Sequence, residues 1–361
     1  MQRSGRRPRR DGPSQVDTGP VVCVRRTPKS TEVFDAYFAF AAERQRMFYR
    51  RLINKHPTTA DPILEAFRFT NVFRASDRVS QFLISEVIPG SEDSAVDTFF
   101  RVMLFKLFNR ISTWQLIEAA LGPVHWPNFD IAGCDRLLAS ARANSTTIYT
   151  AAYIMPDPTL GEGSKHANHL RLLTMMMDDR LPERVAGART MEDVYRLLLG
   201  YRSIGPFLAY QLTIDLNYTS IIDFSEMDFV AAGPGAIDGL TKCFRDSGNL
   251  NSGDLIRFTA AVADEYAQRL GLEVPSLWGR RPQLIDYQNL FCEVDKYARA
   301  KHPHFRGRSG RSRIKQRYRP DMTPMRRGYP AKWRLPLAAA TVDQIEVCFP
   351  GDRGESGIST L

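Results

Sequence analysis

The sequence lacks the features of membrane-spanning and secreted proteins. No apolar run approaches the roughly 18 residues that a membrane span needs, and the Arg-rich start has no apolar stretch like that of a secretory signal. The five cysteines are scattered, and no two lie at the spacing of metal ligands. We therefore expect reduced thiols in an intracellular protein, located in the nucleus if the source is eukaryotic and otherwise in the cytoplasm.

The usual signatures of nucleotide-dependent, hydrolytic and zinc chemistry are also missing. The string closest to a P-loop, at 235–242, has its glycines too close together and lacks the Gly-Lys-Ser/Thr ending, so we expect no kinase activity in this chain. The sequence has no Gly-x-Ser-x-Gly elbow, no dinucleotide fingerprint after a strand, and no His-x-Glu with paired cysteines. His166 and His169 have no acidic or cysteine partner at ligand spacing, which favours satisfied histidines over a metal site. We predict neither a metal nor a cofactor.

What the sequence does have is positive charge gathered in two places. Residues 1–30 hold eight Arg/Lys against two Asp, and residues 296–335 hold fourteen against one Asp. Because the formal net charge is +9, the remainder of the chain carries about −10. Basic segments on an acidic body indicate a polyanionic partner, most simply nucleic acid. The alternative is that these segments serve solubility or targeting.

The hydrophobic periodicity predicts an all-α protein in three parts. Residues 1–30 are rich in Arg, Pro, Gly and Ser, so we expect a disordered basic arm. With Ser30 or Thr31 as N-cap, apolar and aromatic residues recur at helical spacing and predict a helical domain over 31–305, in which 98–120 reads as a single apolar helix. Residues 306–361 form a basic segment and tail, and we expect the apolar residues around Trp333 to dock back onto the body.

A helical hairpin is predicted at 197–209. An apolar helical run ends at Gly200, a short polar loop follows, and a second apolar run begins after Gly205-Pro206. The exposed amides at the start of the second helix suit a phosphate, because the helix dipole lies behind them. Compared with the usual helix-hairpin-helix pattern, Leu-Pro-Gly-Ile/Val-Gly-x-x-Thr-Ala, Ser203 stands where the first glycine is usual. The alternative is a structural turn that holds no phosphate.

Three carboxylates follow the hairpin: Asp223, Glu226 and Asp228. This layout resembles that of helix-hairpin-helix DNA glycosylases, in which an aspartate lies just past the second helix. Asp223 follows Gly205 by eighteen residues and Asp228 by twenty-three, and the glycosylase aspartate lies near the middle of that interval. Asp228 precedes an apolar run that reads as a helix, whose dipole would stabilise the carboxylate. Asp228 and Asp223 are the leading candidates, and the alternative is that either is simply an N-cap.

Four polar residues stand at three- and four-residue steps in a further stretch that reads as helical: Asn71, Arg74, Asp77 and Arg78. On a helix they would share one face. That face is either a solvated, salt-bridged surface or part of a site.

Several long strings, taken together and in this order, resemble one family: FAAERQRMFYRRL, FRFTNVFRASDRVSQFLI, FFRVMLFKLFNRISTW, GYRSIGPFLAYQLTIDLNY, DFVAAGPGA and NLFCEVDKYARAKHP. The family comprises the helical domain attached to 5-hydroxymethyluracil DNA kinases of phages and the stand-alone alpha-glutamyl/putrescinyl-thymine pyrophosphorylases. The resemblance covers about 32–318 and implies an all-helical, glycosylase-related fold that works on thymine-derived bases in DNA. It further implies that a kinase first pyrophosphorylates the 5-hydroxymethyl group, and that the pyrophosphorylase then displaces pyrophosphate with an amine such as glutamate or putrescine.

The resemblance gives the candidate residues their roles. A carboxylate among Asp228, Asp223 and Glu226 would stabilise positive charge on the 5-methylene carbon or take a proton from the amine. Arginines would hold the pyrophosphate, and the substrate-binding set is Arg74, Asp77, Arg78, Asn71 and Arg202. An aromatic side chain would stack on the flipped base, with Phe73, Tyr201 and Phe229 as candidates. The expected DNA contacts are Ser203, Gly205, Lys296, Arg311, Arg313, Lys315 and Arg317.

Three functions stay open on the sequence. The leading one is a DNA base hypermodification enzyme that uses DNA, a small amine and the product of a separate 5-hydroxymethyluracil DNA kinase. The second is a non-catalytic DNA-binding module that partners such a kinase, which would need the basic segments but not the carboxylates. The third is a glycosylase, in which Asp228 would stabilise an oxocarbenium-like sugar.

Overall fold

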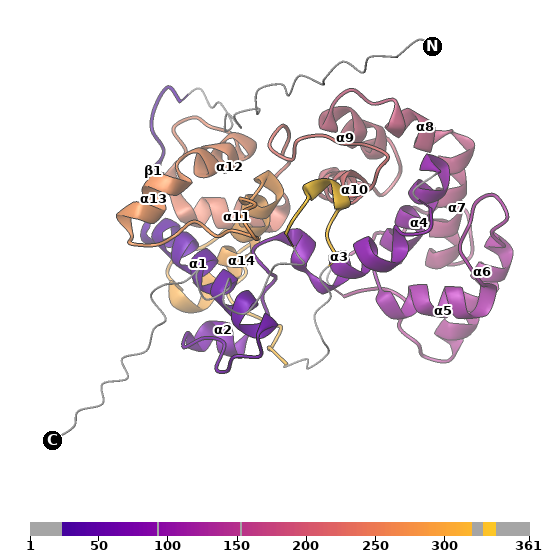
Figure 1. Ribbon diagram of the computed structural model, residues 1–361, viewed down its shortest axis with the longest axis horizontal. Helices are drawn as coiled ribbons and strands as arrows, with labels where there is room; N and C mark the ends of the chain where they lie inside the picture. Colours follow the sequence, from indigo (N-terminus) through magenta and orange to yellow (C-terminus); the bar gives the residue numbers. More distant parts are fainter. Residues whose placement is uncertain (1–23, 92–93, 152–153, 320–327, 337–361) are drawn as a thin grey trace, which may run out of the picture.

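The computed structural model describes residues 24–91, 94–151, 154–319 and 328–336 (Figure 1). Within these residues the fold is all-α, as predicted, and the one small sheet pairs β1 (Lys29–Ser30) with β2 (Phe244–Asp246) in antiparallel fashion. No helix in the described ranges is long and apolar enough to span a membrane. Most of the predicted N-terminal arm, residues 1–23, and much of the predicted tail lie outside the described residues. The expectation of disorder is wrong for the end of the arm, because Lys29 and Ser30 pair with β2.

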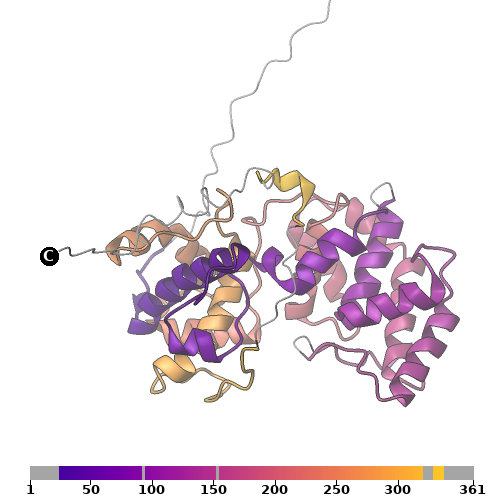
Figure 2. The same cartoon turned by 60° about the horizontal axis from the view of Figure 1, so that its bottom comes forward.

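The helices form two lobes (Figures 1 and 2). The first lobe is built from both ends of the chain: α1 (Glu32–Leu52), α2 (Pro62–Ala66), α11 (Pro234–Cys243), α12 (Ser252–Ala261), α13 (Ala263–Arg269) and α14 (Leu284–Lys301). The second lobe is continuous in sequence: α4 (Ala95–Phe108), α5 (Ile111–Leu121), α6 (Ile131–Ala143), α7 (Lys165–Asp178), α8 (Leu181–Ala186), α9 (Met191–Leu199) and α10 (Pro206–Asn217). The chain therefore crosses between the lobes twice after α1.

The first crossing is made of short turns. It consists of the 3-10 turn η1 (Arg74–Ser76), α3 (Arg78–Phe82) and the π-helical turn η2 (Leu83–Val87). We call the region where η1 meets α10 and α14 the junction. The residues 328–336, which include the 3-10 turn η3 (Ala331–Trp333), lie over the junction between the two lobes (Figure 2). We call them the strap, and they confirm the predicted docking of the chain around Trp333.

Helix α1 begins where the sequence predicts. The Thr31 hydroxyl oxygen accepts a hydrogen bond from Val33 N (3.2 Å) and the same hydroxyl donates to Lys242 O (2.6 Å), so one side chain caps α1 and fixes it to α11. The aromatic residues at helical spacing are buried in the first lobe, and α11 packs closely on α14. That approach requires Gly239, since a Cβ there would lie 2.0 Å from Phe291 O.

The prediction of one apolar helix over 98–120 is wrong, because two helices occupy this stretch. Helix α4 ends at Phe108, and Asn109 adopts a left-handed conformation with φ 50° that terminates the helix. The Asn109 side chain is fixed there, since its Oδ1 accepts a hydrogen bond from Lys106 Nζ (2.7 Å). The resulting bend lets α5 leave the α4 axis, while α4 remains the buried centre of the second lobe.

Candidate functional site

The predicted helical hairpin is formed by α9 and α10, which pack on each other. A capping box at Thr190 begins α9, and Gly205 is the N-cap of α10 with Pro206 in the first turn. Ser203, which replaces the usual glycine, has φ 64°, so the loop does place a left-handed residue there. Its hydroxyl donates to Asp157 O (2.9 Å), which ties the hairpin loop to the segment before α7. No side chain caps the first amides of α10.

Helix α10 is buried over most of its length and carries a carboxylate, Asp215, into the junction. Asp215 is fully buried, and its oxygens face Arg74 Nη1 at 2.8 Å and Lys106 Nζ at 3.1 Å. Burial alone would raise the pKa of this carboxyl, but the two cations outweigh burial and hold the pKa below its ordinary value. Burial also lowers the pKa of Lys106. The three charges hold η1, α4 and α10 together.

Arg74 is therefore not placed as the sequence predicts. Its side chain is 3% exposed, and its Nε donates to Gln211 Oε1 (2.8 Å) in addition to the Asp215 pair. The segment around it is a 3-10 turn rather than an α-helix, because the chain is extended at Phe73 and again at Asp77. The predicted common face consequently does not exist: Arg74 points into the junction, while Arg78 is exposed.

Asn71 and Asp77 meet at the edge of this turn in a different way. Asn71 N donates to Asp77 Oδ1 (2.8 Å), and the Asn71 side chain donates to Ser76 O (2.7 Å) and accepts from Arg44 (2.8 Å). Burial raises the pKa of Asp77 to about 7, against the lowering effect of the Asn71 amide. These bonds shape the turn that presents Arg74 to the junction.

A second buried carboxylate, Glu226, lies at the junction next to an arginine. Glu226 is 4% exposed, and its Oε1 lies 3.3 Å from Arg280 Nη2. Burial raises the pKa of Glu226 to about 7; Arg280 opposes that rise, and the charge of Asp286 adds to it. A buried carboxyl with a pKa near neutrality, beside a cation, is a typical candidate for a functional site.

Asp286 connects this carboxylate to the Arg74 cluster. It lies in the first turn of α14, where its two oxygens accept hydrogen bonds from Arg74 N (2.8 Å) and Gln283 N (2.9 Å). Burial raises the pKa of Asp286 to about 6. Its oxygens hold main-chain amides from two segments, so Asp286 fixes η1 against α14 and brings Glu226 and Asp215 to the same junction.

The other two predicted carboxylates are at the surface. The Asp223 side chain is 80% exposed and pairs with Lys332 (3.2 Å). Asp228 is exposed at the end of a turn, and its main-chain oxygen accepts a hydrogen bond from Arg257 (3.1 Å). The prediction that Asp228 begins a helix is wrong: residues 229–232 are not helical, because Gly233 and Pro234 form the N-terminus of α11 further along.

The spacing signal in the sequence therefore fits Glu226 best. Glu226 follows Gly205 by twenty-one residues, which is the middle of the interval given by Asp223 and Asp228. Its partners Arg280 and Asp286 were missed, because they approach only through folding, from more than fifty residues along the chain. A Gln283–Asp286 capping box is the one local sign that could have drawn attention to Asp286.

The predicted stacking residues are engaged by the protein. Phe73 is 1% exposed and belongs to the core. The Tyr201 hydroxyl donates to Asp179 (3.0 Å), and Phe229 packs against Tyr195 and Tyr210. The Glu226–Arg280 pair lies instead beside Trp333, since Arg280 Cζ is 3.8 Å from the Trp333 ring centroid, and Trp333 in turn contacts Tyr218.

The basic residues after α14 form an extended segment, residues 306–319, which we call the basic strip. The strip is pinned to the first lobe: Ser309 N donates to Asp238 (2.9 Å), Arg313 O accepts from Arg299 (3.1 Å), and residues 316–318 pair with residues 66–68. Its exposed side chains include four of the five cations predicted to contact DNA: Arg311, Arg313, Lys315 and Arg317. Lys296 lies apart from them, because it pairs with Glu293 (2.7 Å) and covers the Phe69 ring.

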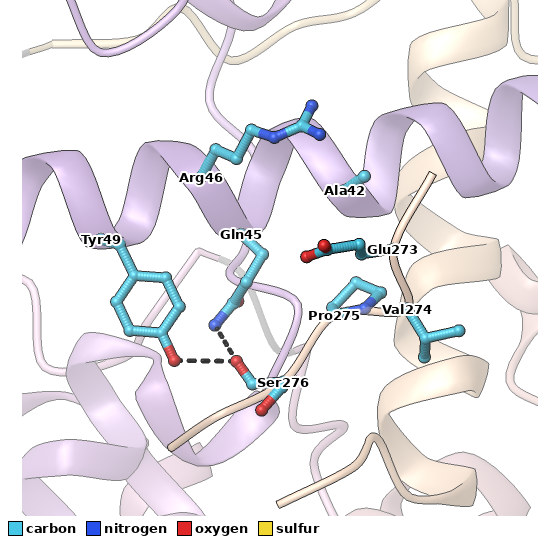
Figure 3. A pocket seen from close by; sticks show the side chains of 8 residues that line it. All are labelled: Ala42, Gln45, Arg46, Tyr49, Glu273, Val274, Pro275 and Ser276. Atoms are coloured by element: carbon cyan, nitrogen blue, oxygen red, sulfur yellow. Dashed lines mark hydrogen bonds between the residues drawn. The ribbon is translucent and has the colours of Figure 1, made fainter. Parts of the chain in front are cut away.

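A small pocket lies between α1 and residues 273–276 (Figure 3). Gln45 Nε2 and Tyr49 Oη both donate to Ser276 O there, at 2.9 and 2.8 Å. None of the residues that line this pocket is a predicted site residue. We therefore place the candidate site at the junction, around Glu226, and not in this pocket. No group of His, Cys, Asp and Glu in the described parts of the chain could hold a metal ion.

Comparison with known proteins gives the family. The chain is 28% identical over 300 residues to the 5-hmdU DNA kinase of Bacillus phage SP10, a match that covers 76% of this chain and 46% of that protein. The chain thus spans about half the length of this relative. No solved structure matches this chain. The family described as the helical domain of 5-hmdU DNA kinase matches residues 31–307, and the chain therefore belongs to this family.

Proposed function

We propose that this chain modifies a thymine-derived base in DNA, by displacing pyrophosphate from 5-(pyrophosphoryloxymethyl)uracil with an amine. The family supports the class of base, since its name and that of the phage relative refer to 5-hmdU in DNA. One observation carries the chemistry: Glu226 is a buried carboxyl whose pKa is raised to about 7, at the junction and past the hairpin.

The reaction needs a group that can accept a proton near neutral pH. The bond between the 5-methylene carbon and the pyrophosphate oxygen breaks, the amine nitrogen forms a bond to that carbon, and the nitrogen gives up a proton. A carboxylate with a pKa near 7 is a competent acceptor, because a general base works best when its pKa lies near the working pH. Glu226 would take the proton, while its negative charge stabilises the positive charge that builds on the carbon.

Cations around the junction would handle the phosphates. Arg280 contacts Glu226 through one terminal nitrogen, and the remaining guanidinium donors are suited to pyrophosphate. Arg78 and Arg202 are exposed, and we propose them as ligands for pyrophosphate or for DNA phosphates. We assign Arg74 to the structural cluster with Asp215.

DNA would bind through the basic strip and the hairpin. The strip presents a row of exposed cations on a pinned, extended backbone, and the uncapped amides at Gly205 would contact a phosphate. A base embedded in a duplex must leave the stack before its 5-methylene group can reach a buried carboxyl. We further propose that a 5-hydroxymethyluracil DNA kinase supplies the pyrophosphorylated base, since the family and the phage relative are named for such a kinase.

The test is a product analysis. Purified protein is incubated with DNA that carries 5-(pyrophosphoryloxymethyl)uracil and with a mixture of amino acids and polyamines, and the nucleosides are then weighed by mass spectrometry. We expect a thymine-plus-amine mass and released pyrophosphate. The Glu226→Gln variant should lose this product by roughly 100-fold or more, whereas Asp228→Asn, an exposed carboxylate in the same loop, should keep it.

Two other outcomes would replace the proposal. A free base with an abasic site would identify a glycosylase. Intact substrate that is tightly bound by both variants would identify a DNA-binding module without catalysis. The exposed basic strip favours this second alternative over the glycosylase, because DNA binding by the strip requires no buried carboxyl.

A further inference from the structure

The strap contacts the arginine that pairs with the candidate carboxylate. Trp333 lies on the Arg280 guanidinium, whose Cζ is 3.8 Å from the ring centroid, and Arg280 is the partner of Glu226. Tyr218 meets the same ring edge-on at 5.6 Å, and Tyr329 stacks on it at 6.2 Å. A planar ring from the strap thus occupies a slot made by a guanidinium and an aromatic edge, directly beside the buried carboxyl.

The slot has unused hydrogen-bond capacity. Among the described residues, Arg280 Nε and Trp278 Nε1 are buried and have no hydrogen-bond partner. Arg280 contacts Trp333, and Trp278 contacts Tyr329 at 5.6 Å, so the two donors border the aromatic pair of the strap. Buried donors without acceptors are uncommon in folded proteins. An indole ring supplies no acceptor oxygen, whereas a pyrimidine with two carbonyl oxygens does.

The strap is held by contacts that can be released together. Gly328 exchanges two hydrogen bonds with the Gln81 side chain (2.6 and 2.9 Å), and the Tyr329 hydroxyl bonds to Ser76 (2.9 Å). Lys332 Nζ donates to Ile222 O (2.7 Å) and pairs with the exposed Asp223. The turn η3 has no fully buried residue. The strap therefore leaves the body only when these contacts and the packing of Trp333 are released together, and a bound ligand must offset that cost.

We propose that the slot filled by Trp333, between Arg280 and Tyr218 and beside Glu226, is a binding site for a pyrimidine base taken out of the DNA stack, and that the strap closes it in the free protein. The modification of that base rests on the proposed function; the slot itself requires only a planar pyrimidine with carbonyl acceptors. The base would replace the indole over Arg280 and give the buried Arg280 Nε an acceptor. Its 5-substituent would then lie near Glu226.

The first experiment follows Trp333 itself. The chain has four tryptophans, so the fluorescence difference between the wild type and Trp333→Phe reports on this one side chain. Acrylamide quenching is measured with and without a DNA duplex that carries a single 5-hydroxymethyluracil. We expect the duplex to make Trp333 severalfold more accessible to the quencher. Unchanged quenching at saturating duplex would overturn the proposal.

The second experiment measures affinity for the same duplex. Trp333→Ala should bind about tenfold more tightly, because the open slot no longer has to expel a ring held by two aromatic contacts and one cation–π contact. Leu335→Ala, an apolar truncation in the same strap, is the matched control and should bind as the wild type does. Lys332→Met keeps the ring but removes an anchor, so it should give a smaller gain and serves if Trp333→Ala does not fold. Weaker binding by folded variants would show that Trp333 supports the bound base instead of excluding it.

Neither experiment depends on turnover, since 5-hydroxymethyluracil has no pyrophosphate to displace. Strap release by this duplex, together with no product from DNA that carries 5-(pyrophosphoryloxymethyl)uracil, would leave the base slot standing and remove the proposed reaction. Product formation with an unresponsive Trp333 would do the reverse.

Discussion

Replacing Glu226 by Gln should remove a pH dependence of stability that the buried carboxyl imposes on the folded protein. Burial raises the pKa of Glu226 from an ordinary 4.5 to about 7. The folded state therefore binds a proton at this site more tightly than the unfolded state does. Between these two pKa values the folded protein holds more protons, so its stability must fall as the pH rises through the window. Glutamine has no such titration.

The size of the effect follows from the two pKa values. The full shift corresponds to about 3 kcal/mol, at about 1.36 kcal/mol for each pKa unit. Between about pH 5 and pH 8 the wild type should lose about 2.5 kcal/mol that the variant keeps. Arg280 loses a charged partner in the variant, so Glu226→Gln is less stable at alkaline pH. This loss of free energy changes little with pH in that range. The informative quantity is thus the difference in free energy of unfolding between the two proteins, and how that difference changes with pH.

Urea unfolding of both proteins at several pH values between about 5 and 8 measures that difference. Asp286 and Asp77, whose pKa values are also raised by burial, titrate in both proteins and largely cancel. Asp228→Asn, an exposed carboxylate two residues away, is the matched control, and its difference from the wild type should stay flat. A flat difference for Glu226→Gln as well would mean that the carboxyl is not desolvated, and the argument for a neutral-pH base would fail with it.

Three further predictions concern the cluster, the hairpin and the strip. Asp215→Asn should lower the free energy of unfolding by about 3–5 kcal/mol, because Arg74 and Lys106 would be left buried without a counter-charge; a loss below about 1 kcal/mol in urea titrations would contradict the cluster. Ser203→Ala should be less stable than Ser203→Gly by about 1 kcal/mol in the same assay, since both lose the hydroxyl bond to Asp157 and only alanine is strained at φ 64°; equal stabilities would show that the loop relaxes. Replacing Arg311, Arg313, Lys315 and Arg317 of the basic strip by Gln should weaken DNA binding and reduce the log–log salt slope by about one unit for each lost phosphate contact. The same change at Arg136 and Arg142 on α6 should leave the slope unchanged.

Local signals predicted much of the fold. Thr31 caps α1 because a hydroxyl before an amphipathic run satisfies the first free amides, and this depends on few neighbours. The hairpin was predicted from an equally local signal, a glycine turn followed by Pro206 in the first turn of the next helix. The helix break at Asn109 was not predicted. An asparagine within an apolar run adopts the left-handed conformation only when its side chain has a partner, which here is Lys106.

The sequence led to the interval in which we place the candidate site, but it did not show which residue of that interval is buried. Spacing after the hairpin led to the interval that contains Glu226, yet three carboxylates stand within six residues and sequence does not show which one is buried. Asp228 is exposed because the apolar residues after it pack as an extended segment that precedes α11. Arg74 was expected to bind the substrate. It is buried instead, because Asp215, 141 residues further along the chain, supplies its counter-charge. Such pairings follow from tertiary contacts alone.

Asp215 and Glu226, two of the buried carboxylates of the junction, differ because their counter-charges differ. Asp215 faces two cations, at 2.8 and 3.1 Å, and these outweigh its burial, so its pKa falls and it stays ionised as a structural group. Glu226 faces one cation at 3.3 Å and also feels the charge of Asp286, so burial dominates and the pKa rises to about 7. One junction thus holds a carboxylate that fixes the lobes and another that can exchange a proton near neutral pH. The charge of Asp215 holds Arg74, and with it η1, against α10. Arg74 N in turn donates to Asp286, which holds η1 against α14. Glu226 can therefore titrate while both contacts stay in place.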